Sequence, residues 1–448
     1  MQRTFDSFGR IERQKRRFVL PGAMEAAFAQ GNTRDQNFLA YGNGRSYGDS
    51  CHNDAGFLVP MRVDAKILAF DPETGILSAD GGVLLSEIIN HVEPHGYFLP
   101  VTPGTRFVTL GGAIANDVHG KNHHRKGSFG CHVLSFDLMR SDGVVYHCSL
   151  TQNEHLFRAT IGGMGLTGLI LGARIQLMPV SGLDIEEKIV SFPHLDVYFE
   201  MAEAADRDNE YAVAWIDQLS HGRSQGRGLL ITGNHADGAA SSSPSTGMKL
   251  SVPFELPFSV LNTATLSLFN AAYFHGKKRK RSPHVTSWQS FFYPLDSVGN
   301  WNRFYGPRGL YQHQSVIPFH CASTVIPAML LASREAGQAS FLTVLKRFTD
   351  MPSPGLMSFP VPGYTLTMDF PNRGARTLDL LERFDRMTVD AGGRVNPYKD
   401  QRMRAQTFAA GYPNWRDLEA FRDRAFNSNF WRRTALALDN GHQGLSAK

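Results

Sequence analysis

Three glycines fall within the stretch YGNGRSYGDS, which spans residues 41–50 and follows the apolar Phe38-Leu39-Ala40. Glycine has no side chain, so its backbone N–H groups can approach a phosphate closely. A loop of this composition can equally be a surface turn. What it does must therefore be judged from the motifs that accompany it.

A second glycine cluster, PGTRFVTLGGAIAN, spans residues 103–116. Here Thr109 can cap a helix whose first turn contains Gly111 and Gly112. Such a terminus is expected to offer unpaired N–H groups and the positive end of the helix dipole to a phosphate. A third run, GGMGLTG at 162–168, leads into a strand. Three glycine-rich surfaces favour a large flat ligand with a pyrophosphate over a mononucleotide.

A nicotinamide-binding loop is excluded. Its fingerprint, G-x-G-x-x-G, requires a helix that opens at the glycines and an acidic residue about 20 positions later. Gly42, Gly44 and Gly48 are spaced G-x-G-x-x-x-G, and the following DSCHND at 49–54 is no helix.

The elements that must position these loops alternate irregularly between strands and helices. Residues 84–92 carry Leu and Ile at helical spacing, and a hairpin is predicted around Asp142-Gly143. Strands are predicted at 56–60, 66–70, 76–79, 211–216 and 228–231. This pattern indicates an α+β protein.

Three later segments have distinct compositions. Residues 236–247 (ADGAASSSPSTG) are of low complexity and predict a surface loop within a domain. Residues 252–274 are apolar and precede the basic run at 277–281. Residues 417–438 are expected to form an amphipathic helix.

Composition describes an ordinary globular protein of 448 residues, with 42% hydrophobic and 19% charged residues and a formal net charge of +5. The four cysteines are widely spaced and form no CxxC pair, which disfavours a disulfide framework or a zinc site. The charged N-terminus does not resemble a signal peptide, and no apolar run is long enough to span a bilayer. We expect a cytoplasmic protein.

The motifs together resemble a known group of flavoproteins. YGNGRSYGDS, PGTRFVTLGGAIANDVHGKNHH, GSFG and GGMGLTG resemble the FAD-binding half of the vanillyl-alcohol-oxidase/p-cresol-methylhydroxylase superfamily. HGKNHH followed by GSFG, with YKD near the C-terminus, resembles the family of oxidase subunits of decaprenylphosphoryl-β-D-ribose 2′-epimerases. The likeness covers almost the whole chain and is weakest across 180–290 and at the C-terminal end.

The resemblance implies a fold of two parts. A two-subdomain FAD-binding domain would span 1–180 and be completed by 394–448. A substrate-binding domain with an antiparallel sheet and helices would span 181–393, and the active site would lie between the two.

The resemblance also implies which residues contact FAD. Most belong to the three glycine-rich regions: Gly42, Asn43, Gly44, Arg45, Ser46, Tyr47, Gly48, Asp49, Gly104, Thr105, Thr109, Leu110, Gly111, Gly112, Asn116, Val118, His119, Ile170 and Asn396. Members with covalently bound FAD often carry a histidine in the first loop, where this chain has Arg45. We therefore expect non-covalent FAD, unless a residue such as His119 forms the link.

Flavin-dependent alcohol oxidation needs a base for the hydroxyl proton and positive charge near the reduced flavin. By resemblance, the catalytic candidates are Lys399, His119 and Tyr293. The implied substrate-binding residues are Trp215, Gln312, Gln314, Lys346, Phe348 and Thr365. On a strand, Gln312 and Gln314 would face one side.

Two details qualify the site. Thr365 and Thr367 stand where the resembled family usually has Asn and Cys, which alters the shape of the sugar pocket. His119, His123 and His124 lack an accompanying carboxylate or cysteine pattern, so no metal is expected.

The basic run 277–281 is either a solvated loop or a contact with anionic lipid headgroups or a polyprenyl phosphate. Polar residues interrupt the apolar segment before it, so this segment would lie on a membrane and not cross it. No aromatic residues interleave with the run as nucleic-acid binding would favour.

These expectations combine into a function. FAD-dependent oxidation of the 2′-hydroxyl of a polyprenyl-phosphoryl-β-D-ribofuranose would give a 2′-keto sugar. An NAD(P)H-dependent short-chain reductase would complete epimerisation to the arabinose donor for cell-envelope glycans, with the protein cytoplasmic or peripheral at the inner face of the plasma membrane. The alternatives are a soluble FAD-dependent sugar-alcohol or aldonolactone oxidase, and a membrane-associated scaffold that retains flavin without turnover.

Overall fold

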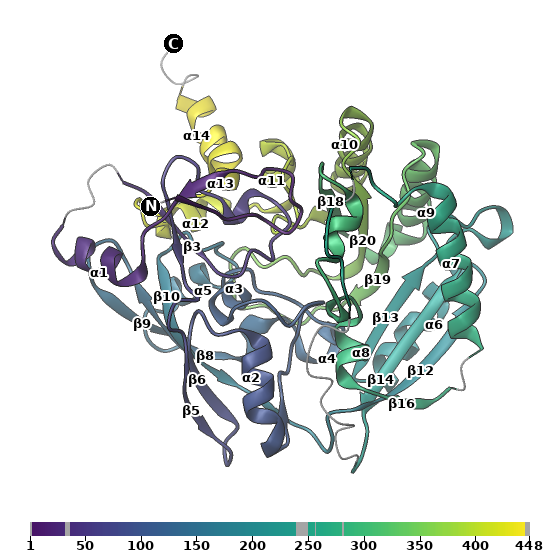
Figure 1. Cartoon of the computed structure of the whole chain (residues 1–448), viewed down its shortest axis with the longest axis horizontal. Helices are drawn as coiled ribbons and strands as arrows, with labels where there is room; N and C mark the ends of the chain where they lie inside the picture. The colour runs from purple at the N-terminus through teal and green to yellow at the C-terminus, as the bar shows by residue number, and fades with distance from the viewer. Residues whose placement is uncertain (1, 32–35, 239–249, 256, 280–281, 444–448) are drawn as a thin grey trace.

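Two antiparallel sheets form the two halves of the molecule (Figure 1). This computed structural model describes residues 2–31, 36–238, 250–255, 257–279 and 282–443. One sheet has five strands and the other has eight, and helices pack against both. The predicted α+β class is therefore confirmed.

The five-stranded sheet has the order β5-β6-β10-β8-β9. Its strands are β5 (Ile67–Asp71), β6 (Ile76–Asp80), β8 (Val133–Met139), β9 (Val145–Ser149) and β10 (Leu169–Gln176). The predicted hairpin at Asp142-Gly143 joins β8 to β9, with Gly143 at φ +78° in the left-handed region. Glycine reaches this conformation without the strain that a Cβ atom would add.

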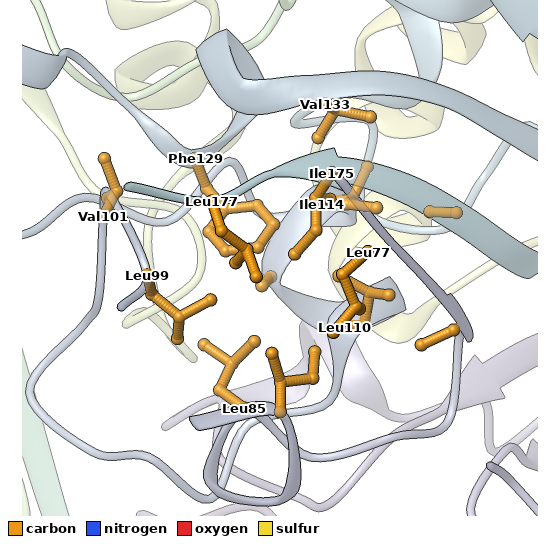
Figure 2. Close-up of a cluster of buried hydrophobic side chains, with 14 of the residues drawn as sticks. Leu77, Leu85, Leu99, Val101, Leu110, Ile114, Phe129, Val133, Ile175 and Leu177 are labelled. Carbon is orange, nitrogen blue, oxygen red and sulfur yellow. The ribbon is translucent and has the colours of Figure 1, made fainter. Parts of the chain in front are cut away.

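Helices α2 (Leu85–Val92) and α3 (Leu110–Ala115) cover one face of this sheet, so the helical spacing at 84–92 is confirmed. Figure 2 shows Leu85, Leu110 and Ile114 from the helical side meeting Leu77 and Ile175 from the strands. These five side chains are at most 1% exposed. Truncating one of them to alanine would typically cost about 2–5 kcal/mol, so this core holds the glycine cluster at 103–116 firmly in place.

The eight-stranded sheet has the order β16-β12-β14-β13-β19-β20-β18-β21, and every pair is antiparallel. Its strands are β12 (Ile185–Phe192), β13 (Tyr211–Ile216), β14 (Gly228–His235), β16 (His284–Thr286), β18 (Leu310–Ile317), β19 (Thr343–Phe348), β20 (Gly363–Pro371) and β21 (Arg394–Val395).

Helices α6 (Leu195–Asp208), α9 (Phe319–Glu335) and α10 (Ala375–Asp390) pack on one face of this sheet. Leu345 and Leu366 point into that core. Successive side chains of a strand alternate between faces, so their neighbours in sequence point toward the other half of the molecule. Helices α7 (Thr263–Lys278) and α8 (Trp288–Phe292) lie on that second face, near β12 and β14.

Shorter elements connect the two halves. The parallel pair β3 (Phe38–Tyr41) and β4 (Phe57–Pro60) flanks the first glycine-rich loop. The other short pairs are β1 (Gln2–Thr4) with β2 (Lys15–Arg17), β7 (Tyr97–Phe98) with β11 (Met178–Pro179), and β15 (Leu250–Ser251) with β17 (Val298–Gly299). The short helices are α1 (Pro21–Ala29), α4 (His123–Lys126), α5 (Glu154–Thr160) and α11 (Ala405–Gly411). The 3-10 helix η6 (Trp301–Tyr305) precedes β18.

The prediction of one continuous helix at 417–438 is wrong. This segment contains α12 (Trp415–Phe421), α13 (Asn429–Arg433) and the start of α14 (Ala435–Gln443). Between α12 and α13 the chain runs beside β3: the Phe38 N–H donates to the Ala425 carbonyl at 2.7 Å, and the Asn427 N–H donates to the Phe38 carbonyl at 3.0 Å. Pairing with a distant strand thus outweighs local helical preference.

Other expectations fall at the edge of what the structure describes. The loop predicted at 236–247 lies outside the described residues from position 239 onward, and so does the end of the basic run, at 280–281. The division into 1–180 with 394–448 and 181–393 stays a prediction; β21 pairs with β18 of the eight-stranded sheet. Within the described ranges, no helix has the length and apolar character needed to cross a bilayer.

Candidate active site

A cavity of about 770 Å³ lies between the two halves. Its volume falls in the range of roughly 300–1,000 Å³ that is usual for ligand sites. The wall contains twenty of the residues expected from sequence: Gly42, Asn43, Gly44, Arg45, Ser46, Tyr47, Gly104, Thr105, Thr109, Gly111, Gly112, Asn116, Val118, His119, Ile170, Gln312, Gln314, Lys346, Asn396 and Lys399.

The loop after β3 presents a row of unused backbone donors to this cavity. Among the described residues, no protein acceptor receives a hydrogen bond from the backbone N–H groups of residues 42–46. Consecutive free N–H groups in a concave loop bind anions such as phosphate. The first glycine-rich loop therefore has the donors that a pyrophosphate requires.

The glycines of this loop are needed for its contacts with the protein. A Cβ atom on Gly42 would lie 2.5 Å from the Thr109 hydroxyl oxygen. Gly44 adopts φ +60°, and a Cβ atom there would overlap the Tyr41 hydroxyl. A Cβ atom on Gly48 would overlap the backbone carbonyl oxygen of Asp400. Glycine thus lets the loop pack against two other segments and fold closely onto its own first residue.

The first turn of α3 differs from the expectation. Thr109 does cap the helix, since its hydroxyl accepts the Gly112 N–H at 3.1 Å. However, the Leu110 N–H donates to Val83 and the Gly111 N–H donates to Gly81, both at 2.7 Å. The prediction that this terminus offers unpaired N–H groups is therefore wrong, because neighbouring carbonyls already accept them.

Arg433 of α13 joins the glycine-rich loop to the segment that carries Lys399. Its guanidinium contacts Asp49 at 2.8 and 2.9 Å and Asp400 at 2.7 Å. Burial alone would raise the pKa of Asp400, but Arg433 and Arg402 hold that pKa below its usual value. Asp49 itself lies behind the cavity wall, so its direct partner is Arg433.

Lys399 projects into the cavity from the turn after β21. Its Nζ lies 4.4 Å from the centroid of the Tyr47 ring, a cation–π distance. Burial lowers the pKa of Lys399 to about 8, although Asp369 opposes this shift. A lysine with this pKa exchanges protons readily near neutral pH.

A second polar network surrounds His119. Lys346 Nζ lies 3.1 Å from His119 Nδ1 and donates to the Gly120 carbonyl at 3.1 Å. The Gln314 amide nitrogen lies 3.1 Å from His119 Nε2, and the Asn396 amide donates to the Gln314 side-chain carbonyl at 2.9 Å. The two halves of the molecule therefore meet through these four side chains.

Burial sets the protonation of this network. It lowers the pKa of His119 well below the usual value, and the nearby Lys346 lowers it further. Burial also lowers the pKa of Lys346 to about 7. With the Gln314 amide donating to Nε2, the proton of the neutral imidazole lies on Nδ1 and faces a neutral Lys346 amine. The lowered pKa of Lys346 is consistent with that arrangement.

Seven expected site residues lie outside the cavity wall, and four of them were expected in catalysis or substrate binding. Trp215 is on the cavity-facing side of β13, but Tyr273 of α7 covers it at a ring distance of 4.9 Å. The Tyr293 hydroxyl is paired with the Thr102 hydroxyl. Phe348 packs edge-on against the His119 ring at 4.8 Å, and Thr365 accepts from the Gln314 amide at 3.0 Å. Their proposed roles remain predictions, as do those of Gly48, Asp49 and Leu110, which also lie behind the wall.

Several parts of the site were not expected from the sequence, among them residues within 295–303, which line the cavity. Residues 6–10 form one edge of the cavity: the Phe8 N–H donates to the Ser46 carbonyl at 2.8 Å, and the Leu310 N–H donates to the Gly9 carbonyl at 2.8 Å. No motif marks this N-terminal segment. Asp369 lies behind Gln312 and accepts a hydrogen bond from its amide. The only sign of it in the sequence is that a carboxylate stands within the largely apolar strand β20.

Among the side chains that the structure describes, no three His, Cys, Asp or Glu residues gather as a metal site. The neighbours His123 and His124 differ in surroundings. His123 packs against Phe348, whereas His124 lies 3.5 Å from Asp206.

Comparison with known proteins agrees with this geometry. Residues 22–149 match the FAD binding domain family. The chain is 35% identical over 390 residues to the decaprenylphosphoryl-β-D-ribose oxidase of Mycolicibacterium smegmatis, covering 84% of this chain and 83% of that protein. It is 31% identical to an uncharacterized protein of Streptomyces coelicolor, covering 79% of this chain and all of that protein. Similarity to mouse L-gulonolactone oxidase, 27% identical, covers 35% of this chain and 36% of that protein.

The residues present fit FAD. The free N–H groups of residues 42–46 suit its pyrophosphate, and the lysines of the opposite wall suit a flavin that gains negative charge on reduction. FAD is therefore the cofactor, and the protein is an FAD-dependent oxidoreductase. The chain belongs to the family of the decaprenylphosphoryl-β-D-ribose oxidases.

Proposed function

We propose that this protein oxidises the 2′-hydroxyl of a polyprenyl-phosphoryl-β-D-ribofuranose to a 2′-ketone. One observation carries the proposal: Lys399 and the His119–Lys346 network face the same cavity as the phosphate-binding loop. The likeness over most of both chains to a decaprenylphosphoryl-β-D-ribose oxidase supports the substrate class.

Each part of the cavity has a proposed task. The N–H groups of residues 42–46 bind the FAD pyrophosphate, and FAD supplies the acceptor for the hydride from C2′ of the sugar. Gln312 and Gln314 offer amides to the sugar hydroxyls from one face of β18.

Lys399 is the proposed base. With a pKa of about 8, a useful fraction of its amine is neutral at physiological pH and can accept the proton of the 2′-hydroxyl. Lys399 would thus take the proton of the alcohol, while FAD would supply the acceptor for the hydride, and together these make up the two-electron oxidation. The Lys399 ammonium would provide positive charge for a cofactor that gains negative charge on reduction.

The product also implies a partner. A 2′-ketone returns to an alcohol of the opposite configuration when a hydride reaches its other face. We propose that an NAD(P)H-dependent short-chain reductase performs this second step and yields the arabinose donor for cell-envelope glycans.

The surface around α7 supports an association with lipid at the inner face of the plasma membrane. Phe254, Phe258 and Leu268 are 66%, 62% and 75% exposed. Lys278 and Arg279 are exposed at the end of the same helix. Exposed apolar side chains favour binding at a bilayer interface, and basic residues near an anionic surface add about 1 kcal/mol each.

The decisive experiment follows flavin reduction without oxygen. Purified protein with FAD is mixed with a polyprenyl-phosphoryl ribose, and in parallel with ribitol and with L-gulonolactone. Loss of the flavin absorbance with the lipid-linked sugar alone is the expected result. Bleaching by the free polyol or lactone would instead favour the soluble oxidase, and bleaching by none of them would favour a scaffold without turnover.

A further inference from the structure

Asp369 is a carboxylic acid enclosed behind the cavity wall. It lies on the cavity-facing side of β20, opposite Gln312 in the strand register, and its side chain has no exposed surface. The Gln312 amide donates to its Oδ1 at 2.6 Å. Its Oδ2 has no hydrogen-bond partner among the described residues. A buried carboxylate with a free oxygen is costly, so the fold retains it at the expense of stability.

Among the described residues, Lys399 is the cation whose charge shifts the pKa of Asp369, and Asp369 in turn shifts the pKa of Lys399. Burial raises the pKa of Tyr47, from the loop after β3, and of Tyr305, from η6, and the charge of Asp369 raises both further. The Tyr305 hydroxyl and the Gln312 side-chain carbonyl are likewise buried without described partners. Polar groups therefore gather here with only part of their hydrogen-bonding capacity satisfied.

We propose that Asp369 is a positioning residue for the oxidation, which acts from behind the wall by fixing the Gln312 amide and by setting the charge of Lys399. The proposal rests on the proposed function. In this arrangement the hydroxyl proton of the substrate moves to the Lys399 amine, and FAD would supply the acceptor for the hydride. The ammonium that forms is stabilised by the Asp369 carboxylate, so the negative charge of this residue assists the proton transfer.

The acidities of the two groups agree with this role. Burial raises the pKa of Asp369 to about 7, with Gln312 and Lys399 opposing the shift. The pKa of Lys399 is lowered to about 8. Two interacting groups with such values titrate as a pair near neutral pH.

The first test measures thermal unfolding from pH 4.5 to 8.5 for wild type and Asp369→Asn. The folded pKa of Asp369 is raised above its unfolded value of 3.8, so the stability linked to its protonated form is present at low pH and is lost as pH rises through about 7. The wild-type melting temperature should therefore fall relative to the asparagine variant up to about pH 7, and then run parallel to it. Parallel curves over the whole range would overturn the proposal.

Asp217→Asn is the matched control. Asp217 is also buried, but its carboxyl is paired with Arg227 at 2.9 Å and lies outside the cavity wall. The melting temperature of Asp217→Asn should therefore keep the pH dependence of the wild-type protein, because Asp369 is still present. If the Asp369 variant does not fold, Gln312→Met replaces it: loss of the amide donor should move the wild-type transition to higher pH, and an unmoved transition would contradict the proposal.

The second test measures the pH profile of flavin reduction by lipid-linked ribose. Loss of the carboxylate should lower the pKa of Lys399 and move the profile of Asp369→Asn to lower pH by about one unit. Asp369→Glu should restore most of the wild-type profile. An unchanged profile in the asparagine variant would refute the link to Lys399. If wild type reduces no flavin, the proposed function fails, and the unfolding data alone decide on Asp369.

Discussion

Lys399 and Lys346 both line the cavity, but they differ in how many hydrogen-bond partners hold their amines. Lys346 is held by His119 and by the Gly120 carbonyl. Lys399 rests on the Tyr47 ring, and among the described residues its Nζ has no hydrogen-bond acceptor. A lysine without an acceptor is available to a substrate hydroxyl, so Lys399 is the better candidate for the base and Lys346 the better candidate for the support of His119.

Lys399→Ala should retain FAD but reduce it at least about a hundredfold more slowly with substrate, as expected for loss of one preorganised polar group. Lys188→Ala, which changes an exposed lysine of β12, is the control and should react like wild type. Rapid anaerobic mixing gives the rate, and the visible spectrum gives the FAD content. A rate within a few-fold of wild type would move the role of base to His119, Lys346 or Tyr293.

The reduction rate should also depend on pH through Lys399. Its folded pKa of about 8 means that the neutral amine grows as pH rises through this value and is lost below it. Wild-type reduction should therefore accelerate between pH 6.5 and 9 and then level off. In Lys399→Ala this rise of the rate with pH should disappear. A rise that persists in the variant would assign the titration to another group.

Single site residues could be predicted from the sequence where they belong to a recognisable motif. The family resemblance pointed to Lys399, Gln312 and Gln314, and the i, i+2 spacing put the two glutamines on one face of a strand. All three line the cavity. Trp215 shows the limit: strand alternation puts it on the correct face, but α7 packs over it. Asp369 shows the opposite case, since only packing of distant segments encloses it.

Among the elements, the glycine-rich loop at 41–50 depends most on distant parts of the chain. Gly42 packs against Thr109 of the second glycine cluster, and Gly48 packs against Asp400 of the C-terminal segment. The conformation of the loop therefore depends on its contacts with Thr109 and Asp400. These contacts also hold its free N–H groups in place.

Gly48→Ala tests this view. The new methyl group would overlap the Asp400 carbonyl, so the loop and the Lys399 segment must move apart, at a cost of about 1–3 kcal/mol. We expect a lower melting temperature and weaker FAD retention after gel filtration. Gly22→Ala is the control, because a Cβ atom there has open space. Wild-type FAD retention in Gly48→Ala would show that the loop tolerates displacement.

Local patterns predicted the elements better than their ends. The helix at 84–92 and the strands around the hairpin at 142–143 follow from spacing and turn residues alone. The C-terminal segment was misjudged because its central residues pair with β3, almost 390 positions earlier. A helical pattern carries no information about such a partner.

The whole molecule joins two sheets around one cofactor. Arg45, which stands where related proteins with covalent FAD carry histidine, lies between Phe8 and Phe107 with its guanidinium carbon 5.5 Å from each ring centroid. The ring nitrogens of His119 are both engaged by Gln314 and Lys346. Neither residue is free to bond to the flavin.

FAD should therefore leave the protein on denaturation. Acid precipitation of the purified yellow protein is expected to put all flavin absorbance in the supernatant. A covalently flavinylated oxidase processed in parallel serves as the control and should keep its colour in the pellet. Flavin that remains with this chain would point to a covalent link and to a tautomer of His119 other than the one inferred above.

The surface around α7 makes a prediction about lipid. Phe254→Ser, Phe258→Ser and Leu268→Ser together should reduce flotation with anionic vesicles without changing FAD content, because exposed apolar area is lost. Lys278→Glu with Arg279→Glu should reduce it further and lower its sensitivity to salt. Leu68→Ser with Leu150→Ser removes comparable exposed residues near the five-stranded sheet and is the control. Equal flotation of all variants would leave α7 an ordinary solvent-facing helix.

The FAD-binding half could be predicted from sequence because its glycine motifs are contiguous and specific. How the two sheets face each other could not be predicted, since the contacts that unite them join residues as distant as Asp49, Asp400 and Arg433. The domain boundary near residue 394 could not be predicted for the same reason. Strand β21 pairs with the eight-stranded sheet, whereas the turn directly after it lines the cavity between the two halves.

The ion pairs of Arg433 have a consequence for biosynthesis. This arginine is synthesised after both of the segments that it joins, so the nascent chain cannot fasten the glycine-rich loop to the segment of Lys399 until synthesis has passed residue 433. Stable cofactor loading should then wait until α13 has been made. Prematurely terminated chains that lack α13 would leave the ribosome colourless, however well their first sheet had already folded.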